Sequence, residues 1–223
     1  MKKSKVVSSD IETELFLRYP KLLECREAFE LAYNILLESY KENKKVLLAG
    51  NGGSAADSEH IVGELMKSFL FDRRLDSDLI CTLKEHYGDD GEKLIEQLEG
   101  GLPAIPLTSM PALSTAYAND TSSAACFAQM TQVLGCEGDV FLGISTSGNS
   151  ENILLAIMAA KARHMHTICL TGKSGGKCKG LADVCICVPE DETFKVQELH
   201  LPVYHALCAM IESELFEQKE VGK

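Results

Sequence analysis

The chain has 223 residues, 45% of them apolar and 25% charged, which is enough for one α/β domain with a sizeable core. Its 33 acidic and 22 basic residues give a net charge of −11, which argues against nucleic-acid binding, because such surfaces need clustered Lys and Arg. The nine cysteines form no C-x-x-C pair, and no run reaches the ~18 apolar residues of a membrane span. We therefore predict a cytoplasmic protein with no membrane association.

Residues 10–42 carry apolar side chains at helical spacing, and Pro20 is expected to divide them into a short helix and a longer one. Five short apolar runs follow, each bounded by turn residues. Because their apolarity is continuous rather than alternating, they are typical of strands buried on both faces of a parallel sheet. These runs are 45–50, 103–109, 139–146, 166–172 and 183–190.

Segments with helical periodicity lie between and after these runs, at 54–69, about 111–134, 150–163, 176–182 and 194–218. The alternation predicts a single domain over 1–223 with a doubly wound, five-stranded parallel sheet in a three-layer αβα, flavodoxin-like arrangement. Cys185 and Cys187 are expected on one face of the last strand as small core residues. Pro202 predicts a kink or a later start of the last helix.

The charged stretch 71–101 does not fit this alternation. It is too long for a plain connection, since loops beyond ~12–15 residues are usually functional or carry structure of their own. We interpret it as an insertion with a helical piece near 92–99, placed near the mouth of the site.

Two polar turns, GNGGS at 50–54 and STSGNS at 145–150, follow the first and third predicted strands. Ligands bind open α/β sheets at the carboxyl ends of strands, where glycines admit a close approach and helix N-termini attract anions. One such turn alone is better explained as an ordinary helix cap. Two of them favour a phosphate site, although neither matches the Gly-Lys-Ser/Thr or G-x-G-x-x-G nucleotide motifs.

His60 and Glu64 are four residues apart on a predicted helix, so both side chains can reach one ion or one substrate. Alone, such a pair is more often a solvated helix face. The last helix adds Gln197 and His205, which fall on related faces and can project together.

Five motifs in this order resemble the sugar isomerase (SIS) domain family, and within it the sedoheptulose 7-phosphate (phosphoheptose) isomerases. They are GNGGS, H-x-x-x-E, GDVFLGISTSGNS, LTGK-x-GGK and QE-x-H-x-x-x-x-H. The resemblance covers almost the whole chain except 71–101. It implies a homotetramer with active sites at subunit interfaces and a phosphosugar substrate. The implied reaction converts D-sedoheptulose 7-phosphate to D-glycero-D-manno-heptose 7-phosphate, towards the heptose of lipopolysaccharide.

The resemblance also implies the roles of individual residues. Glu64 would move the carbon-bound proton through an enediol and His205 the oxygen-bound proton, while Zn²⁺ polarises the carbonyl. The implied zinc ligands are His60, Glu64, Gln197 and His205. The implied substrate-binding residues are Asn51, Gly52, Gly53, Ser54, Asn119, Asp120, Ser145, Thr146, Ser147, Ser150 and Gln197. Whether Glu64 is a metal ligand, a base or both stays open at this point.

The chain departs from the family where an Arg commonly follows the glutamate, since it reads Leu65-Met66-Lys67-Ser68 here. It departs again at Phe194, where the family often has Asp. Two alternatives to the heptose phosphate isomerase are therefore kept. One is a non-catalytic SIS scaffold or binding protein of the type that associates with a replication initiator, and the other is an isomerase or binder for another phosphosugar.

Overall fold

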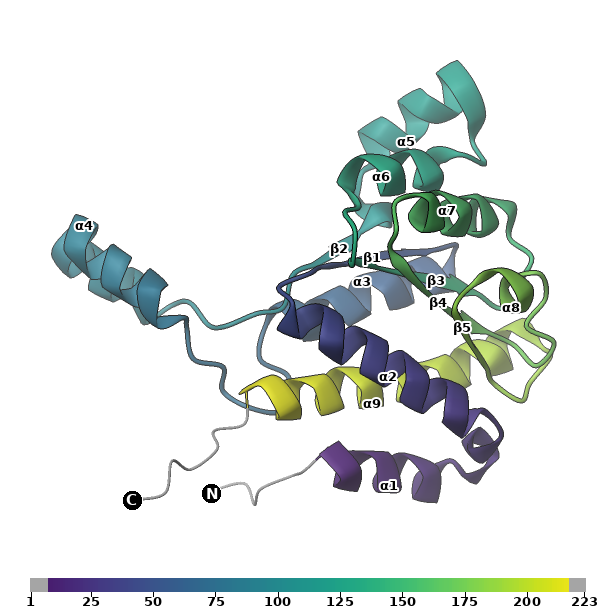
Figure 1. Ribbon diagram of the computed structural model, residues 1–223, viewed down its shortest axis with the longest axis horizontal. Coiled ribbons are helices and arrows are strands. Elements are labelled where there is room, and N and C mark those ends of the chain that lie inside the picture. Colours follow the sequence, from purple (N-terminus) through teal and green to yellow (C-terminus); the bar gives the residue numbers. More distant parts are fainter. Residues whose placement is uncertain (1–7, 217–223) are drawn as a thin grey trace.

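The computed structural model describes residues 8–216, which are centred on a five-stranded sheet with helices on both faces (Figure 1). The strands run parallel in the order β2-β1-β3-β4-β5. Their bounds are β1 Val46–Gly50, β2 Ala104–Pro106, β3 Val140–Ser145, β4 His166–Thr171 and β5 Val184–Cys187. Each strand lies within one of the five apolar runs, and the doubly wound order confirms the predicted fold class.

Alternate residues of the central strands contribute to two cores, one on each face of the sheet. Val46 and Leu48 of β1 belong to the first core, and Leu47 belongs to the second. The first core is closed by α2 (Arg26–Lys41), α3 (Gly53–Met66) and α9 (Thr193–Phe216), and the second by α6 (Cys126–Leu134), α7 (Glu151–Ala162) and α8 (Cys178–Leu181). Burial on both faces explains why the strand sequences do not alternate.

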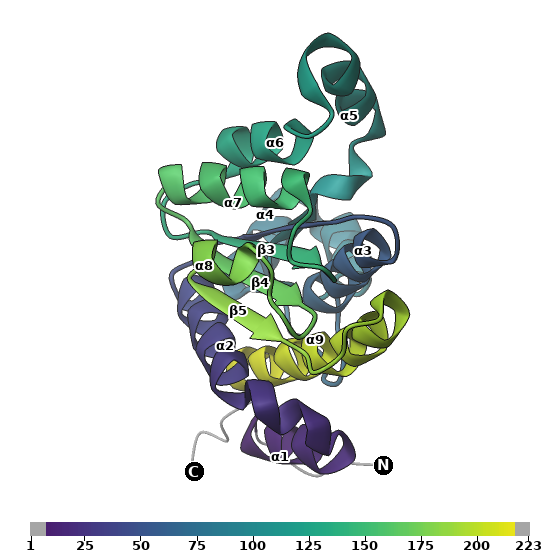
Figure 2. The same cartoon turned by 90° about the vertical axis from the view of Figure 1, so that its right-hand side faces the viewer.

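Pro20 divides the N-terminal helical region, as the sequence predicts. Helix α1 (Ser8–Arg18) is followed by the 3-10 turn η1 (Pro20–Cys25) and then by α2. Proline suits the first position of η1, because its missing N–H would have no partner there. Helix α1 packs against α9 on the side remote from the sheet (Figure 2).

The last helix, α9, runs through Pro202, so the predicted later start of this helix is wrong. Its predicted end at 218 lies outside the described residues. Buried Val203 and Leu207 pack this part of α9 into the first core, and such packing offsets the ~3 kcal/mol that proline costs inside a helix. Within residues 8–216, no helix is both long and apolar enough to cross a membrane.

The predicted helix over 111–134 is interrupted. After the short turn η2 (Leu107–Ser109) come α5 (Pro111–Tyr117), a π-helical turn η3 (Ala118–Ser122) and then α6. Neither α5 nor η3 contains a buried residue, so no packing enforces a regular helix there. The Asn, Asp, Thr and Ser side chains after residue 118 also compete for backbone hydrogen bonds, which disfavours a helix interior.

The insertion forms α4 (Ser77–Ile95), which is longer than the helical piece predicted near 92–99. The Asp76 side chain caps it by accepting hydrogen bonds from two backbone N–H groups of the first turn, at 2.9 and 3.2 Å. Gly88, at φ 51°, breaks it into two segments, and Gly91 of the second lies against Leu83 of the first. Helix α4 extends away from the sheet (Figure 1), whereas Arg73, near the start of the insertion, contacts the backbone of Glu64; the predicted place of the insertion near the mouth of the site stays a prediction.

Cys185 and Cys187 lie on one face of β5, as predicted, with their Sγ atoms 3.6 Å apart. Both side chains are half-buried, and Cys185 packs at the edge of the second core rather than in its centre.

Candidate active site

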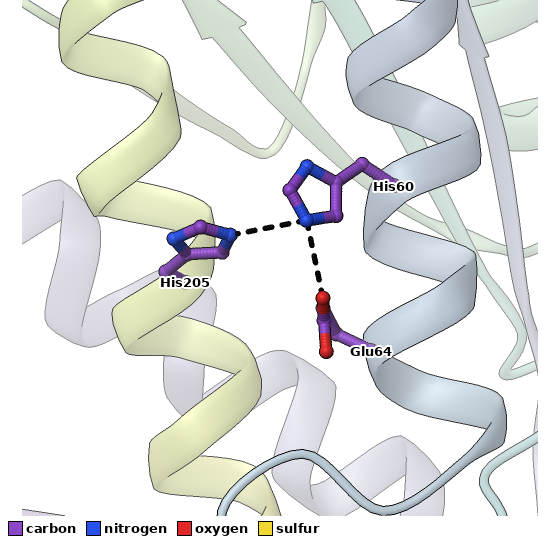
Figure 3. Close-up of side chains that lie close together, drawn as sticks. All are labelled: His60, Glu64 and His205. Carbon is purple, nitrogen blue, oxygen red and sulfur yellow. Dashed lines mark hydrogen bonds and ion pairs between the residues drawn. The ribbon is translucent and has the colours of Figure 1, made fainter.

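Helices α3 and α9 lie side by side and bring three of the four predicted metal ligands together. His60 and Glu64 project from α3 towards His205 on α9 (Figure 3). His60 Nε2 lies 3.1 Å from Glu64 Oε1 and 3.3 Å from His205 Nε2. One donor atom from each residue lies within 4.8 Å of the others, so this group can hold a metal ion.

The chemistry of this group suits a cation. Two imidazole nitrogens and a carboxylate oxygen are common ligands of divalent transition metals. Glu64 Oε2 is buried without a hydrogen-bond partner among the described residues, and the Lys67 ammonium is 3.6 Å away. Burial lowers the pKa of His205, and the neighbouring His60 lowers it further, which keeps a ring nitrogen of His205 available as a ligand.

The other ring nitrogen of His60 contacts Tyr204, which in turn contacts Asp57, and sequence reasoning missed both residues. Tyr204 Oη lies 3.1 Å from His60 Nδ1 and 3.2 Å from Asp57 Oδ1. Burial raises the pKa of Tyr204 and is also the main cause of the raised pKa of Asp57. The sequence signal was slight, because it consisted only of an Asp three residues before His60 and a Tyr beside His205.

The two polar turns lie next to each other at the carboxyl edge of the sheet. Asn51 Nδ2 donates to Asn152 Oδ1 at 3.0 Å, and Asn152 Nδ2 donates to Asn51 Oδ1 at 2.8 Å. Within the second turn, the hydroxyls of Ser145 and Ser150 are 2.9 Å apart. Asn152, which the sequence analysis did not select, therefore links the turn after β1 to the turn after β3.

The second turn is closed by the loop that follows β4. Gly148 has φ 64°, and a Cβ atom there would lie 2.1 Å from the carbonyl oxygen of Gly175. The backbone N–H of Lys177 donates to Asn149 Oδ1 at 3.1 Å, and the N–H of Asn149 donates to Ser147 Oγ at 3.2 Å. Only glycine permits this close approach, which shapes the turn that carries the predicted phosphate-binding hydroxyls.

Gln197, on α9, directs its side chain to the start of α3 and not towards His205. A Cβ atom on Gly53 would lie 2.5 Å from Gln197 Nε2, so the amide packs against the first residue of α3. Along α9, Gln197 is about 12 Å from His205 at ~1.5 Å per residue. Gly52, the residue before α3, has φ 56° and fits the sharp turn between β1 and this helix.

Asn119 and Asp120 occupy η3, where Asn119 Nδ2 donates to Asp120 Oδ1 at 2.8 Å. Both are exposed. The region between α5 and α6 lies on the opposite face of the sheet from α9 (Figures 1 and 2). Within this chain, these two residues are not brought to the His60–Glu64–His205 group.

A buried ion pair fixes the end of α3 to α9. Arg73 Nε lies 2.7 Å from Glu212 Oε1, and both side chains are fully buried. The Arg73 guanidinium also donates to the backbone carbonyl oxygens of Glu64, at 2.8 Å, and Leu65. Glu212 in turn accepts from the backbone N–H groups of Phe69 and Leu70 at 2.8 and 2.6 Å. The backbone that carries Glu64 is thereby tied to the last helix.

Comparisons with known proteins agree with this arrangement. Two SIS domain family models match residues 117–210 and 22–100. Phosphoheptose isomerases from Aneurinibacillus thermoaerophilus and Clostridium acetobutylicum are both 40% identical, over 83% and 86% of this chain and 81% and 85% of their own lengths. The solved phosphoheptose isomerase of Neisseria gonorrhoeae is 31% identical with a TM-score of 0.67, and the match covers 90% of this chain and 98% of that one. The chain therefore belongs to the phosphoheptose isomerase family of SIS domain proteins.

Proposed function

We propose that this protein is a phosphoheptose isomerase that interconverts D-sedoheptulose 7-phosphate and D-glycero-D-manno-heptose 7-phosphate. The observation that carries the proposal is the grouping of His60, Glu64 and His205 on the helices beside the two linked turns, in a chain 40% identical to phosphoheptose isomerases. From Ser54 to His60 the rise along α3 is about 9 Å at ~1.5 Å per residue. That length suits a phosphate held at the turns and a reacting end held at the three side chains.

The residues present supply the acid and base that this isomerisation needs. Glu64 takes the proton from C1 of the ketose, giving an enediol, and returns it to C2 to form the aldose. His205 removes the proton from the C1 hydroxyl and delivers a proton to the oxygen on C2. Its lowered pKa keeps it neutral near pH 7, so the ring nitrogen that is not a metal ligand carries a proton, which it can give to the oxygen on C2 and regain from the C1 hydroxyl. General acid–base catalysis of this kind contributes roughly 10²–10⁴-fold to the rate.

The proposed cofactor is Zn²⁺, held by His60, Glu64 and His205, with Gln197 as a further ligand. When bound, zinc polarises the substrate carbonyl and stabilises developing negative charge on oxygen. Glu64 has two carboxylate oxygens, of which Oε1 faces His60 and Oε2 has no hydrogen-bond partner among the described residues. One oxygen can therefore serve the ion while the other serves the proton. For Gln197 to join the group, its side chain has to turn away from Gly53.

The phosphate group is proposed to sit between the two linked turns. Backbone N–H groups at the starts of α3 and α7 and the nearby hydroxyls would hold it. The proposed contacts to phosphate and sugar are made by Asn51, Gly52, Gly53, Ser54, Ser145, Thr146, Ser147 and Ser150.

We further propose that this single-domain chain acts in the cytoplasm as a homotetramer whose active sites lie between subunits, without nucleic-acid or membrane partners. Two observations support the assembly. Asn119 and Asp120 lie on the face of the sheet opposite α9, so the sugar contacts proposed for them would belong to the site of another subunit. His205 also borders an open, largely apolar cavity of about 470 Å³ between α1 and α9, a surface suited to a neighbouring chain. Sedimentation equilibrium of the purified protein tests the assembly, and a monomer that turns over substrate would contradict it.

Incubation with sedoheptulose 7-phosphate, followed by detection of an aldose phosphate, tests the activity. Glu64→Gln should abolish turnover while leaving the circular dichroism spectrum and thermal unfolding unchanged, because it removes the base but keeps the side-chain shape. Glu85→Gln, an exposed glutamate on α4, is the matched control and should retain full turnover. Normal turnover by Glu64→Gln would refute the assignment of the base.

A different phosphosugar is the second candidate, because the stretch 65–68 lacks the Arg, and Phe194 replaces the Asp, that resemblance to the family leads one to expect. A panel of phosphoketoses of five to seven carbons distinguishes the two candidates. Conversion of a shorter sugar without conversion of the heptulose phosphate would favour the second. A non-catalytic scaffold would convert none of them, and it has no need for three adjacent ligand side chains.

A further inference from the structure

His60 is contacted on both sides of its ring. Its Nε2 faces Glu64 and His205, while its Nδ1 faces the hydroxyl of Tyr204, which in turn contacts Asp57. Tyr204 is 1% exposed, so protein rather than solvent determines where its hydroxyl proton points. The two ring nitrogens of a neutral histidine differ, since one carries the proton and the other a lone pair. The partners of Nδ1 therefore decide what Nε2 offers to the site.

Two hydrogen-bond patterns are possible for Asp57, Tyr204 and His60. Tyr204 has one hydroxyl proton and can donate it either to Asp57 Oδ1 or to His60 Nδ1. If it donates to His60, the Asp57 carboxylate has no hydrogen-bond donor among the described residues, because Asp57 Oδ2 is buried without a partner. A half-buried carboxylate that has one fully buried oxygen and no donor is the costlier outcome. The pattern that satisfies Asp57 is therefore Tyr204 donating to Asp57 and His60 Nδ1–H donating to Tyr204.

We propose that Asp57 and Tyr204 are positioning residues that hold His60 in its Nδ1–H tautomer, so that the Nε2 lone pair points at Glu64 and His205. In this state, His60 Nε2 has no proton to donate to Glu64 Oε1, 3.1 Å away. The three ligand atoms lie within 4.8 Å of one another, so all of them can reach one cation. The arrangement is a carboxylate–histidine pair in which a tyrosine hydroxyl stands between the two, and such outer partners orient metal ligands and raise their basicity.

The inference rests on the proposed zinc isomerase only for the role that it gives to His60. The tautomer of His60 itself can be measured without zinc or substrate. The protein has six histidines, so metal-free protein labelled with ¹⁵N-histidine gives a simple solid-state NMR spectrum at pH 8. The His60→Gln variant assigns the His60 signals. We expect Nδ1–H in the unmodified protein and a change towards Nε2–H, donating to Glu64, in Tyr204→Phe. A predominant Nε2–H tautomer in the unmodified protein, or the same tautomer in both proteins, would overturn the proposal.

Zinc affinity gives the second measurement. Removing an outer partner of a metal-bound histidine typically weakens metal binding by about 10–100-fold, so Tyr204→Phe should weaken zinc binding by that factor in a chelator competition. Tyr40→Phe is the matched control, because Tyr40 is also buried but its hydroxyl has no hydrogen-bond partner within residues 8–216. Equal zinc affinities for the two variants would contradict the proposal. Absence of zinc binding by the unmodified protein would refute the proposed metal instead, and the NMR result would then decide on the tautomer alone.

Discussion

The pair formed by Arg73 and Glu212 allows a quantitative test of how the site is held in place. Glu212→Gln keeps the size of the side chain but removes its charge. The Arg73 guanidinium then stays buried without a counter-charge, and the new amide –NH₂ faces donors, since Glu212 accepts from Arg73 Nε and from two backbone N–H groups. Both side chains are fully buried, so water cannot replace the lost contacts.

Breaking a buried pair by removing one charge costs about 3–5 kcal/mol of unfolding free energy. With a urea dependence of about 2 kcal/mol per M, the midpoint should fall by roughly 1.5–2.5 M. Glu212→Gln should also disturb the position of Glu64, because Arg73 donates a hydrogen bond to the backbone carbonyl of Glu64. Replacing both partners by apolar residues, in Arg73→Met with Glu212→Leu, should recover much of the stability, since it leaves no unpaired buried charge.

Urea unfolding followed by circular dichroism, at one fixed protein concentration, measures these differences. Asp90→Asn is the matched control, because Asp90 pairs with Lys93 on α4 and both side chains are largely exposed. An exposed pair contributes only about 0–1 kcal/mol. If the Glu212→Gln midpoint falls no further than that of Asp90→Asn, or if the double variant is less stable than Glu212→Gln, the reasoning about this pair is wrong.

Three further outcomes follow from single contacts. Gly148→Ala should lower the melting temperature, because a Cβ at φ 64° would lie 2.1 Å from the Gly175 oxygen and such strain costs about 1–3 kcal/mol. Asn152→Ala should raise KM about tenfold (~1.4 kcal/mol) with a smaller change in kcat, because it releases Asn51 from the paired turns. Burial lowers the pKa of His200 to about 4, so the unfolded chain binds more protons between about pH 4 and 6.5. The unfolding free energy should therefore fall as pH drops through that window, and urea unfolding of His200→Gln should show a flatter profile.

The sheet was predictable because its signal is local. The run 139–146, for example, contains β3 over Val140–Ser145, and every residue of that strand is buried. The helix predicted over 111–134 was wrong because periodicity does not reveal whether a face has a partner. Residues 126–134 pack against α7 and form α6, whereas 111–122 contain no buried residue, and the helix there gives way to a π-helical turn after Tyr117. In the insertion, Gly88 interrupts the helical pattern, so that sequence reasoning found only its end.

The residues of the site also divide into those that a local pattern predicts and those that depend on how the helices pack. His60 and Glu64 were predictable as a pair because four residues along one helix guarantee proximity. His205 is 145 residues from His60, and only the resemblance to a family motif joined it to the His60–Glu64 pair. The Tyr204–Asp57 contact depends on how α9 is aligned along α3, which no local pattern determines. The same alignment places Gln197 against Gly53 instead of beside His205.

That alignment is fixed at three points along the two helices. Gln197 packs on Gly53 at the start of α3, His60 meets His205 and Tyr204 in the middle, and Arg73 joins the end of α3 to Glu212. The turn that precedes α3 and the three chemical side chains are thus carried by one packed pair of helices rather than by separate loops. Side chains on packed helices hold their geometry more closely than side chains on loops, and proton transfer depends on that geometry. A substitution that slides α9 along α3 should therefore impair metal binding, proton transfer and phosphate binding together, even where it touches none of the reacting groups.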